Sequence, residues 1–322
     1  MQGAIIMALA LNKAEHVSRC LELAILLEVS ADKPGNVNLV VGFEGTNHMH
    51  FFASAVAAAP HFRLAAERGI SVSKGEIGFE DIRVGYIIRD CVSEVSAWQS
   101  GGNTLLGTII LLSPIAVAAG MALNEKGVFE ISSLRRNLRN IVEATTPEDA
   151  VAVYEAIRIA NPSGLGKAPD LDVNNPNSIS RILKERISLY QVFKIASNYD
   201  TVCSEWVNNY PITFDFAYPN LIEEVRKSTD LNVAIIHTFL KVLARNPDTF
   251  IARKVGIEKA REVSFMAEEV LKHGGLNTSL GKEKLHEFDL MLRKSDSLLN
   301  PGTTADIIAA ALALSILNGL RP

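Results

Sequence analysis

Leu105-Leu-Gly-Thr-Ile-Ile-Leu-Leu-Ser-Pro-Ile-Ala-Val-Ala-Ala-Gly-Met-Ala-Leu123 is the stretch of sequence that decides the fold. It belongs to a longer segment, from Glu94 to Glu125, that carries no charged side chain between its ends. The apolar stretch is long enough to cross a bilayer. However, Pro114 interrupts it and no basic cluster flanks it. Four glycines also dilute the segment, Gly101, Gly102, Gly107 and Gly120. We therefore predict a buried central helix, with a membrane-associated protein inserted through this stretch as the alternative.

Outside this stretch, apolar residues recur at the three- and four-residue spacing of amphipathic helices. Four such stripes are Val84, Ile88, Val92 and Val95; Val233, Ile236, Leu240 and Leu243; Ala260, Val263, Ala267 and Val270; and Leu285, Phe288 and Leu292. Strand-like alternation is limited to Thr213-Phe-Asp-Phe-Ala-Tyr218, which Pro211 and Pro219 confine to a few residues. The pattern predicts an all-α fold, a large bundle of about a dozen helices with little or no β-sheet.

Segments rich in Gly, Pro and Asn separate the predicted helices, at 32–45, 100–103, 161–177 and 300–304. The third is long for a connection between helices, which is typical of a functional loop or lid. A length of 322 residues suits one large helical domain or two fused lobes. We therefore expect a single all-α domain over 1–322, or two helical lobes joined near 161–177.

Composition narrows the functional classes. Hydrophobic residues make up 48% of the chain and charged residues 21%, which is ordinary globular usage. A net charge of −4 and a pI of about 6.0 give no basic surface for nucleic acid. Cys20, Cys91 and Cys203 form no Cys-x-x-Cys pair, so we expect reduced thiols. No Lys or Arg precedes the N-terminal apolar run, so we predict no signal peptide and a cytoplasmic protein.

Three polar loops combine glycine with asparagine or threonine, Lys33-Pro-Gly-Asn36, Gly101-Gly-Asn-Thr104 and Asn300-Pro-Gly-Thr-Thr-Ala-Asp306. The last two directly precede apolar helices, whose first N–H groups and dipoles favour an anion. Simple helix capping also explains each loop, and Thr303 with Asp306 has the spacing of a variant capping box. Two such helix starts, together with Lys33, indicate a shared phosphate site.

Carboxylates form a second group. Asp170 and Asp172 lie in the long loop, Asp200 and Glu205 lie around a predicted helix start, and Asp248 precedes Arg253-Lys254. Carboxylates in such places suit Mg²⁺, although each is also explained as a cap or a solvated charge. The two cations are explained either by an exposed intrahelical ion pair with Asp248 or by phosphate binding.

Familiar motifs are missing from the sequence. Gly164-Leu-Gly-Lys167 lacks the first glycine and the Ser/Thr of a P-loop, and there is no G-x-G-x-x-G after a strand, no G-x-S-x-G and no H-E-x-x-H. His48-Met-His50 has no third ligand at zinc spacing. These absences disfavour the α/β nucleotide-binding folds and the common hydrolase sites.

At the same loops the chain resembles the triphosphoribosyl-dephospho-coenzyme A synthase family, helical proteins that make the prosthetic-group precursor of citrate and malonate lyases. The resemblance runs from Leu27-Glu-Val-Ser-Ala-Asp-Lys-Pro-Gly-Asn-Val37 to the 300–306 loop. Between them, Asn103-Thr-Leu-Leu-Gly-Thr108 is similar to the family's Asn-Thr-x-x-Gly helix start. Asp248-Thr-Phe-Ile-Ala-Arg-Lys254 is similar to its later Asp-Thr segment. The order and spacing of these motifs carry the resemblance.

The resemblance implies transfer of the 5-triphosphoribosyl group of ATP to the 2′-hydroxyl of dephospho-coenzyme A, with release of adenine. Such a reaction needs a carboxylate near the cationic ribose, a base for the hydroxyl and an acid for the purine. It also needs Mg²⁺ with Lys or Arg to hold the triphosphate of its substrate ATP. We expect nucleotide and coenzyme substrates, no nucleic-acid or membrane partner, and leave a homo-oligomer open. A non-catalytic helical protein that binds nucleotide or coenzyme is the alternative.

The predicted site combines residues matched to the family with residues chosen for their chemistry. The matched residues are Lys33, Asn36, Asn103, Asp248, Asn300 and Asp306. We predict Asp248, Asp200 and Glu205 as catalytic and Asp170 and Asp172 as metal-binding. The predicted substrate-binding set is Lys33, Asn36, Asn103, Thr104, Arg253, Lys254, Asn300, Thr303 and Asp306. The chain departs from the family at Leu105, where lyase-associated members carry His, at Arg253-Lys254 and at Pro162–Lys167, which leaves the acceptor open.

Overall fold

The structure, a computed structural model, describes residues 2–122, 129–294 and 297–322. Within these ranges it contains fifteen α-helices and no β-strand beyond one isolated bridge between Phe43 and Thr46. The all-α prediction is confirmed. The strand candidate at 213–218 was wrong, because residues Thr213–Ala217 form a π-helical turn, η2, that leads into the next helix. With no strand beside it, this segment satisfies its backbone groups along the chain.

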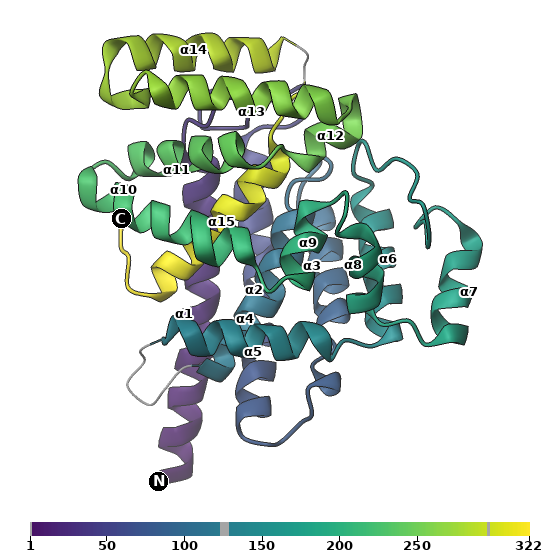
Figure 1. Cartoon of the computed structure of the whole chain (residues 1–322). Helices are drawn as coiled ribbons and strands as arrows, with labels where there is room; N and C mark the ends of the chain where they lie inside the picture. The colour runs from purple at the N-terminus through teal and green to yellow at the C-terminus, as the bar shows by residue number, and fades with distance from the viewer. Residues whose placement is uncertain (1, 123–128, 295–296) are drawn as a thin grey trace.

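The helices follow one another, most of them through short connections, and wrap around two central members (Figure 1). The first seven are α1 (Gln2–Ser30), α2 (His48–Ser73), α3 (Val84–Trp98), α4 (Leu106–Ala122), α5 (Ile131–Glu143), α6 (Pro147–Ala160) and α7 (Pro176–Glu185). The next four are α8 (Leu189–Ala196), α9 (Thr201–Val207), α10 (Tyr218–Lys227) and α11 (Leu231–Arg245). The last four are α12 (Thr249–Val255), α13 (Ile257–Lys272), α14 (Ser279–Arg293) and α15 (Gly302–Leu317). Two 3₁₀ turns, η1 (Glu80–Ile82) and η3 (Gly275–Asn277), complete the path.

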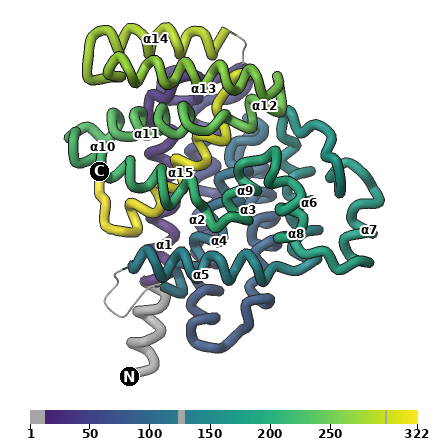
Figure 2. Tube along the Cα trace, in the orientation of Figure 1, coloured from purple at the N-terminus to yellow at the C-terminus, as the bar shows by residue number. Residues whose placement is uncertain are grey.

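The central members are α4 and α15, which have no polar face. Every residue of α4 from 108 to 120 is buried, and so is every residue of α15 from 303 to 317 except Asp306. They contact each other, and α15 also packs against α1, so helices from opposite ends of the sequence lie side by side (Figure 2). The prediction of a buried central helix is confirmed for residues up to 122, while Leu123 lies outside the described residues. No helix among the described residues is long and apolar enough to span a membrane.

Glycine lets α2 and α4 approach through their backbones. A β-carbon at Gly120 of α4 would lie 2.1 Å from the Ala66 carbonyl oxygen of α2. A β-carbon at Gly69 of α2 would lie 2.0 Å from the Val117 carbonyl oxygen of α4. A side chain at either position would force the two helices apart. Gly120, one of the glycines that dilute the apolar stretch, therefore serves close helix packing.

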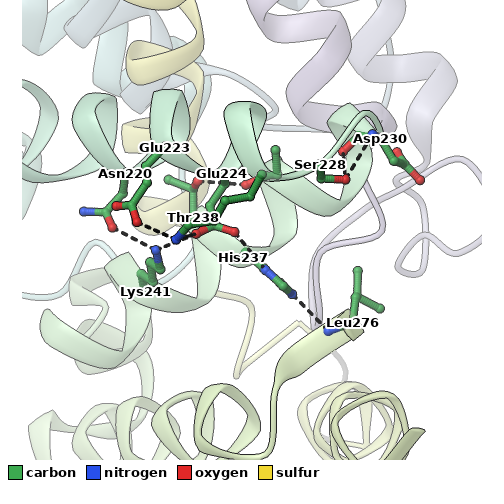
Figure 3. A network of polar contacts seen from close by, with 11 residues as sticks. Asn220, Glu223, Glu224, Ser228, Asp230, His237, Thr238, Lys241 and Leu276 are labelled. Atoms are coloured by element: carbon green, nitrogen blue, oxygen red, sulfur yellow. Dashed lines mark hydrogen bonds and ion pairs between the residues drawn. The ribbon is translucent and has the colours of Figure 1, made fainter. Parts of the chain in front are cut away.

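A buried ion-pair network joins α10, α11 and η3 (Figure 3). Glu224 lies 3.1 Å from His237 Nδ1 and accepts a 2.8 Å hydrogen bond from Lys241 Nζ. His237 Nε2 accepts the backbone N–H of Leu276 at 2.9 Å, which makes Nδ1 the protonated nitrogen. Burial raises the pKa of Glu224, but the hydrogen bonds from Lys241, His237 and Lys227 lower it to about 2. The network fixes the α13–α14 end of the bundle to α11.

The buried apolar core is continuous from Ala14 in α1 to Leu317 in α15. The long loop, residues 161–175, connects α6 to α7 at one side of the bundle (Figure 1). The domain organisation, either a single domain or two lobes joined near 161–177, stays a prediction. Cys20, Cys91 and Cys203 are free thiols, as expected from their spacing.

Candidate functional site

The predicted polar loops meet at one cavity of about 260 Å³. It lies where α4, α9, α12 and α15 begin, and the 161–175 loop with α6 and α8 closes its other side. Ten of the predicted site residues line it, Asn36, Asn103, Thr104, Asp170, Asp172, Asp200, Arg253, Asn300, Thr303 and Asp306. Four predicted residues are not in the lining, Lys33, Glu205, Asp248 and Lys254. Segments up to 270 residues apart in sequence therefore build a common cavity, since Asn36 and Asp306 both line it.

The start of α4 forms one polar edge of the cavity. Asn103 Oδ1 accepts the Leu106 N–H at 3.1 Å, which caps the helix as its sequence predicts. Thr104 Oγ1 lies 2.7 Å from Ser54 Oγ of α2, which holds the loop against the bundle. The first N–H groups of α4 then lie at the cavity, where the helix dipole favours a negative charge.

The start of α15 forms the opposite edge, and its cap comes from another helix. Asp248 Oδ2 accepts both the N–H and the Oγ1–H of Thr304 at 2.7 Å. Its Oδ1 caps α12 by accepting the N–H of Phe250 at 2.9 Å and of Ile251 at 3.1 Å. Asp248 is only 2% exposed, and burial raises its pKa. The structure thus places the predicted catalytic Asp248 behind the cavity wall, where it positions two helix starts.

The capping-box interpretation of Thr303 and Asp306 is wrong. The N-cap of α15 is Pro301 and makes no side-chain hydrogen bond. Asp306 points instead toward α4, where its Oδ1 accepts the Thr108 hydroxyl at 2.5 Å. Tertiary contacts between α4, α12 and α15 override the local capping pattern.

Arg253 is the one cation that lines the cavity among the described residues. It donates a short hydrogen bond to Asp200, whose other oxygen caps α9 by accepting the Cys203 N–H at 3.0 Å. Of the two explanations for these cations, the intrahelical ion pair with Asp248 is wrong for Arg253, because Arg253 pairs across helices with Asp200. Lys254 instead lies 3.9 Å from the centre of the Phe250 ring and donates to the Ser297 carbonyl at 2.8 Å.

Lys33 and Glu28 form a buried ion pair behind the Asn36 loop. Lys33 Nζ lies 3.1 Å from Glu28 Oε1 and also donates to the carbonyls of Glu28 and Ala31. Lys33 is fully buried, whereas Glu28 contributes to the cavity lining. Burial raises the pKa of Glu28 and lowers that of Lys33. Sequence reasoning missed Glu28, although an acid near the end of an apolar helix, five residues before Lys33, was a usable signal.

Glu205 makes only structural contacts among the described residues. Its carboxylate accepts the N–H groups of Ile212 and Thr213 at 2.8 Å and the Thr213 hydroxyl at 2.5 Å. It is fully buried, which raises its pKa. These bonds satisfy the turn that enters η2. The structure does not place Glu205 at the cavity.

Asp170 and Asp172 line the cavity and also shape the long loop. Asp170 Oδ1 pairs with Arg181 at 2.6 Å. Asp172 accepts the N–H groups of Ala168 and Asn174, both at 2.7 Å. No group of three or more His, Cys, Asp or Glu side chains in the described part of the chain is arranged to hold a metal ion.

An apolar wall completes the cavity, and sequence reasoning did not find it. It is formed by side chains of the long loop and of α6, α8 and α9, including Leu165, Leu171, Tyr154, Phe193 and Val202. The Tyr154 hydroxyl donates to the Leu171 carbonyl, which ties the loop to α6. The cavity thus has a polar side of helix starts and carboxylates and an apolar side suited to a ring or an alkyl chain.

Fold and site together define an all-helical protein whose ligand cavity is built at converging helix starts. The CitG family model, described as ATP:dephospho-CoA triphosphoribosyl transferase, matches residues 14–322. The chain belongs to this family of transferases, which acts in coenzyme biosynthesis.

Individual relatives agree with the family match. A Malonomonas rubra protein named "Probable 2-(5''-triphosphoribosyl)-3'-dephosphocoenzyme-A synthase" is 24% identical over 308 residues, covering 94% of this chain and 88% of that protein. A Citrobacter koseri protein of the same name is 28% identical over 99 residues, 31% of this chain and 32% of that protein. The crystal structure of an Archaeoglobus fulgidus protein described as a "putative triphosphoribosyl-dephospho-coA synthase" superposes with a TM-score of 0.59 at 22% identity, covering 84% of this chain and 99% of that one. This last similarity shows a shared fold.

Proposed function

We propose that this transferase moves the triphosphoribosyl group of ATP to the 2′-hydroxyl of dephospho-coenzyme A and releases adenine. The observation that carries the proposal is the meeting of two helix starts, α4 and α15, with Arg253 and several carboxylates in one cavity. Helix starts and an arginine suit phosphate groups. Carboxylates near the ribose would stabilise the positive charge that develops as the N-glycosidic bond breaks. The apolar wall offers a surface for the purine or for the coenzyme's alkyl arm.

Charge in the cavity favours a substrate that brings a divalent cation. The lining contains five carboxyl groups, those of Glu28, Asp170, Asp172, Asp200 and Asp306, against the single guanidinium of Arg253 in the described residues. The carboxyl groups still outnumber it without Asp306, whose pKa is raised to about 8. A bare triphosphate would be repelled by this surface. Mg²⁺ is usually bound by one or two carboxylates together with substrate phosphates, and it neutralises their charge. We propose Asp172 as a protein ligand, because Asp170 is paired with Arg181 and Asp200 with Arg253.

The test is incubation of the purified protein with ATP and Mg²⁺, with and without dephospho-coenzyme A, followed by chromatography for free adenine. We expect adenine release that depends on both the acceptor and Mg²⁺. Release only with another hydroxyl-bearing coenzyme would show that the acceptor has changed. ATP binding without any adenine release would contradict the proposal and favour a non-catalytic binding protein.

Arg253→Met should raise the KM for ATP by about 10- to 100-fold, because a charge-assisted hydrogen bond to phosphate contributes about 1.5–3 kcal/mol. The measurement is adenine release as a function of ATP concentration. Arg135→Met is the matched control, since Arg135 forms a two-bond pair with Asp215 at 2.5 and 2.7 Å and does not line the cavity. Equal effects of the two substitutions would remove Arg253 from substrate binding.

A further inference from the structure

Of the two carboxyl oxygens of Asp306, only Oδ1 accepts a hydrogen bond from a described residue. Oδ1 accepts the Thr108 hydroxyl at 2.5 Å, while no hydrogen bond from any described residue reaches Oδ2. Asp306 is half-buried in an otherwise buried helix and lines the cavity. A β-carbon at Gly107 would lie 2.1 Å from Oδ2, so glycine leaves the space that this oxygen occupies at the start of α4.

From this geometry we propose that Asp306 is the general acid that protonates the departing adenine, an inference that rests on the proposed transferase reaction. The bond between C1′ of the ribose and the purine nitrogen breaks, and its electron pair passes to the base. The proton on Asp306 Oδ2 moves to a ring nitrogen of that base. The acceptor oxygen forms the new bond to C1′, and its hydroxyl proton returns to the carboxylate. The net proton movement is from the acceptor hydroxyl to adenine.

The surroundings of Asp306 keep a proton on it at neutral pH. Burial raises its pKa to about 8, against the opposing hydrogen bond from Thr108. The charges that act on it are those of Glu28 in α1, Asp248 before α12 and Asp200 before α9, and all three raise its pKa. A carboxylic acid held neutral in this way can donate a proton in the reaction.

The charged groups on other elements that pack against α15 have partners of their own. Glu224 of α10 pairs with His237 and Lys241 of α11 (Figure 3). Asp215 of η2 pairs with Arg135 of α5. Arg253, at the same cavity, pairs with Asp200. Glu28 and Asp200 are themselves paired with Lys33 and Arg253, but their charges and that of Asp248 still raise the pKa of Asp306.

Other residues of the cavity are less suited to this role. Among the described lining residues there is no histidine. Tyr154 donates its hydroxyl proton to a carbonyl, and Asp200 is held by Arg253. Glu28 is paired with Lys33. Asp306 has an oxygen, Oδ2, that accepts no hydrogen bond from a described residue, and its raised pKa keeps it protonated at neutral pH.

The test compares Asp306→Asn with wild type on ATP and on ATP methylated at N7 of the purine. An asparagine can still accept the Thr108 hydroxyl, so circular dichroism should show an intact helical fold. We expect kcat with ATP to fall about 10²- to 10⁴-fold. The N7-methylated base is already cationic and leaves without a proton, so its release should fall less than about tenfold. In wild type, kcat with ATP should decline as pH rises through about 8, and this decline should be absent in Asp306→Asn.

Thr108→Val adds a second measurement, the pH dependence of activity, which would not change if Asp306 were only structural. It removes the hydrogen bond that lowers the pKa of Asp306, so the alkaline decline of wild-type activity should shift to higher pH. Equal losses with both nucleotides in Asp306→Asn, or no loss with either, would overturn the assignment of the acid. If wild type itself releases no adenine, the proposed reaction fails and the inference fails with it, a result distinct from the other two.

Discussion

Asp248→Ala should lower the free energy of unfolding by about 2–4 kcal/mol, because it removes the caps of two helices and leaves buried N–H groups without partners. Adenine release should be lost as well, since Asp248 holds the start of α15 beside Asn300, Thr303 and Asp306. Denaturant unfolding followed by circular dichroism measures the first effect, and the adenine assay measures the second at a temperature where the variant remains folded.

Asp230→Ala is the control for this variant. Asp230 is also an N-cap, accepting the Asn232 N–H at 2.9 Å at the start of α11, but it is exposed and does not line the cavity. It should cost about 1 kcal/mol and leave adenine release unchanged. If Asp248→Ala behaves like this control, the carboxylate does not join α12 and α15 in the way that the hydrogen bonds indicate.

Gly120→Val is expected to destabilise the protein strongly. Its β-carbon would lie 2.1 Å from the Ala66 carbonyl oxygen, so α2 and α4 must separate. Overpacking of a core commonly costs about 1–3 kcal/mol, and contact with a rigid backbone places this variant at the upper end or beyond. The expected result is a low yield of soluble protein and a reduced melting temperature.

Ala122→Val serves as the comparison, because Ala122 lies in the same helix but is only half-buried. It should change the melting temperature little. A Gly120→Val variant as stable as the Ala122→Val variant would mean that α2 and α4 are not in backbone contact at this point.

Much of the fold could be predicted from residue patterns because helix formation is governed by neighbours three and four positions apart. The uncharged stretch after Gly107 required a buried helix, and the amphipathic stripes required helices around it. The caps at Asn103 and Asp248 were also local signals. The same local reasoning failed at Thr303 and Asp306, where the capping-box spacing is present. The Thr303 hydroxyl lies 3.3 Å from the Thr249 hydroxyl, and Asp306 accepts the hydroxyl of Thr108.

Part of the candidate site could be predicted as well. Glycine with asparagine or threonine before an apolar helix identified Asn103, Thr104, Asn300 and Thr303, and all four line the cavity. The pairing of Arg253 with Asp200, and of Lys33 with Glu28, could not be assigned, because several oppositely charged partners were available along the chain. Only the packing of the helices brings one of these partners within a few ångströms of Arg253 or Lys33.

The sequence by itself determined that this protein is a bundle of helices around uncharged central members and that its polar loops resemble those of a transferase family. The tertiary structure decided which of those loops face one cavity, which carboxylates lie behind its wall, and which groups pair with each carboxylate. The physical reason is the distance along the chain over which each effect acts. Helix propensity and capping depend on residues within one or two turns. Burial, ion pairing and the pKa of a group such as Asp306 depend on residues brought together from distant parts of the chain.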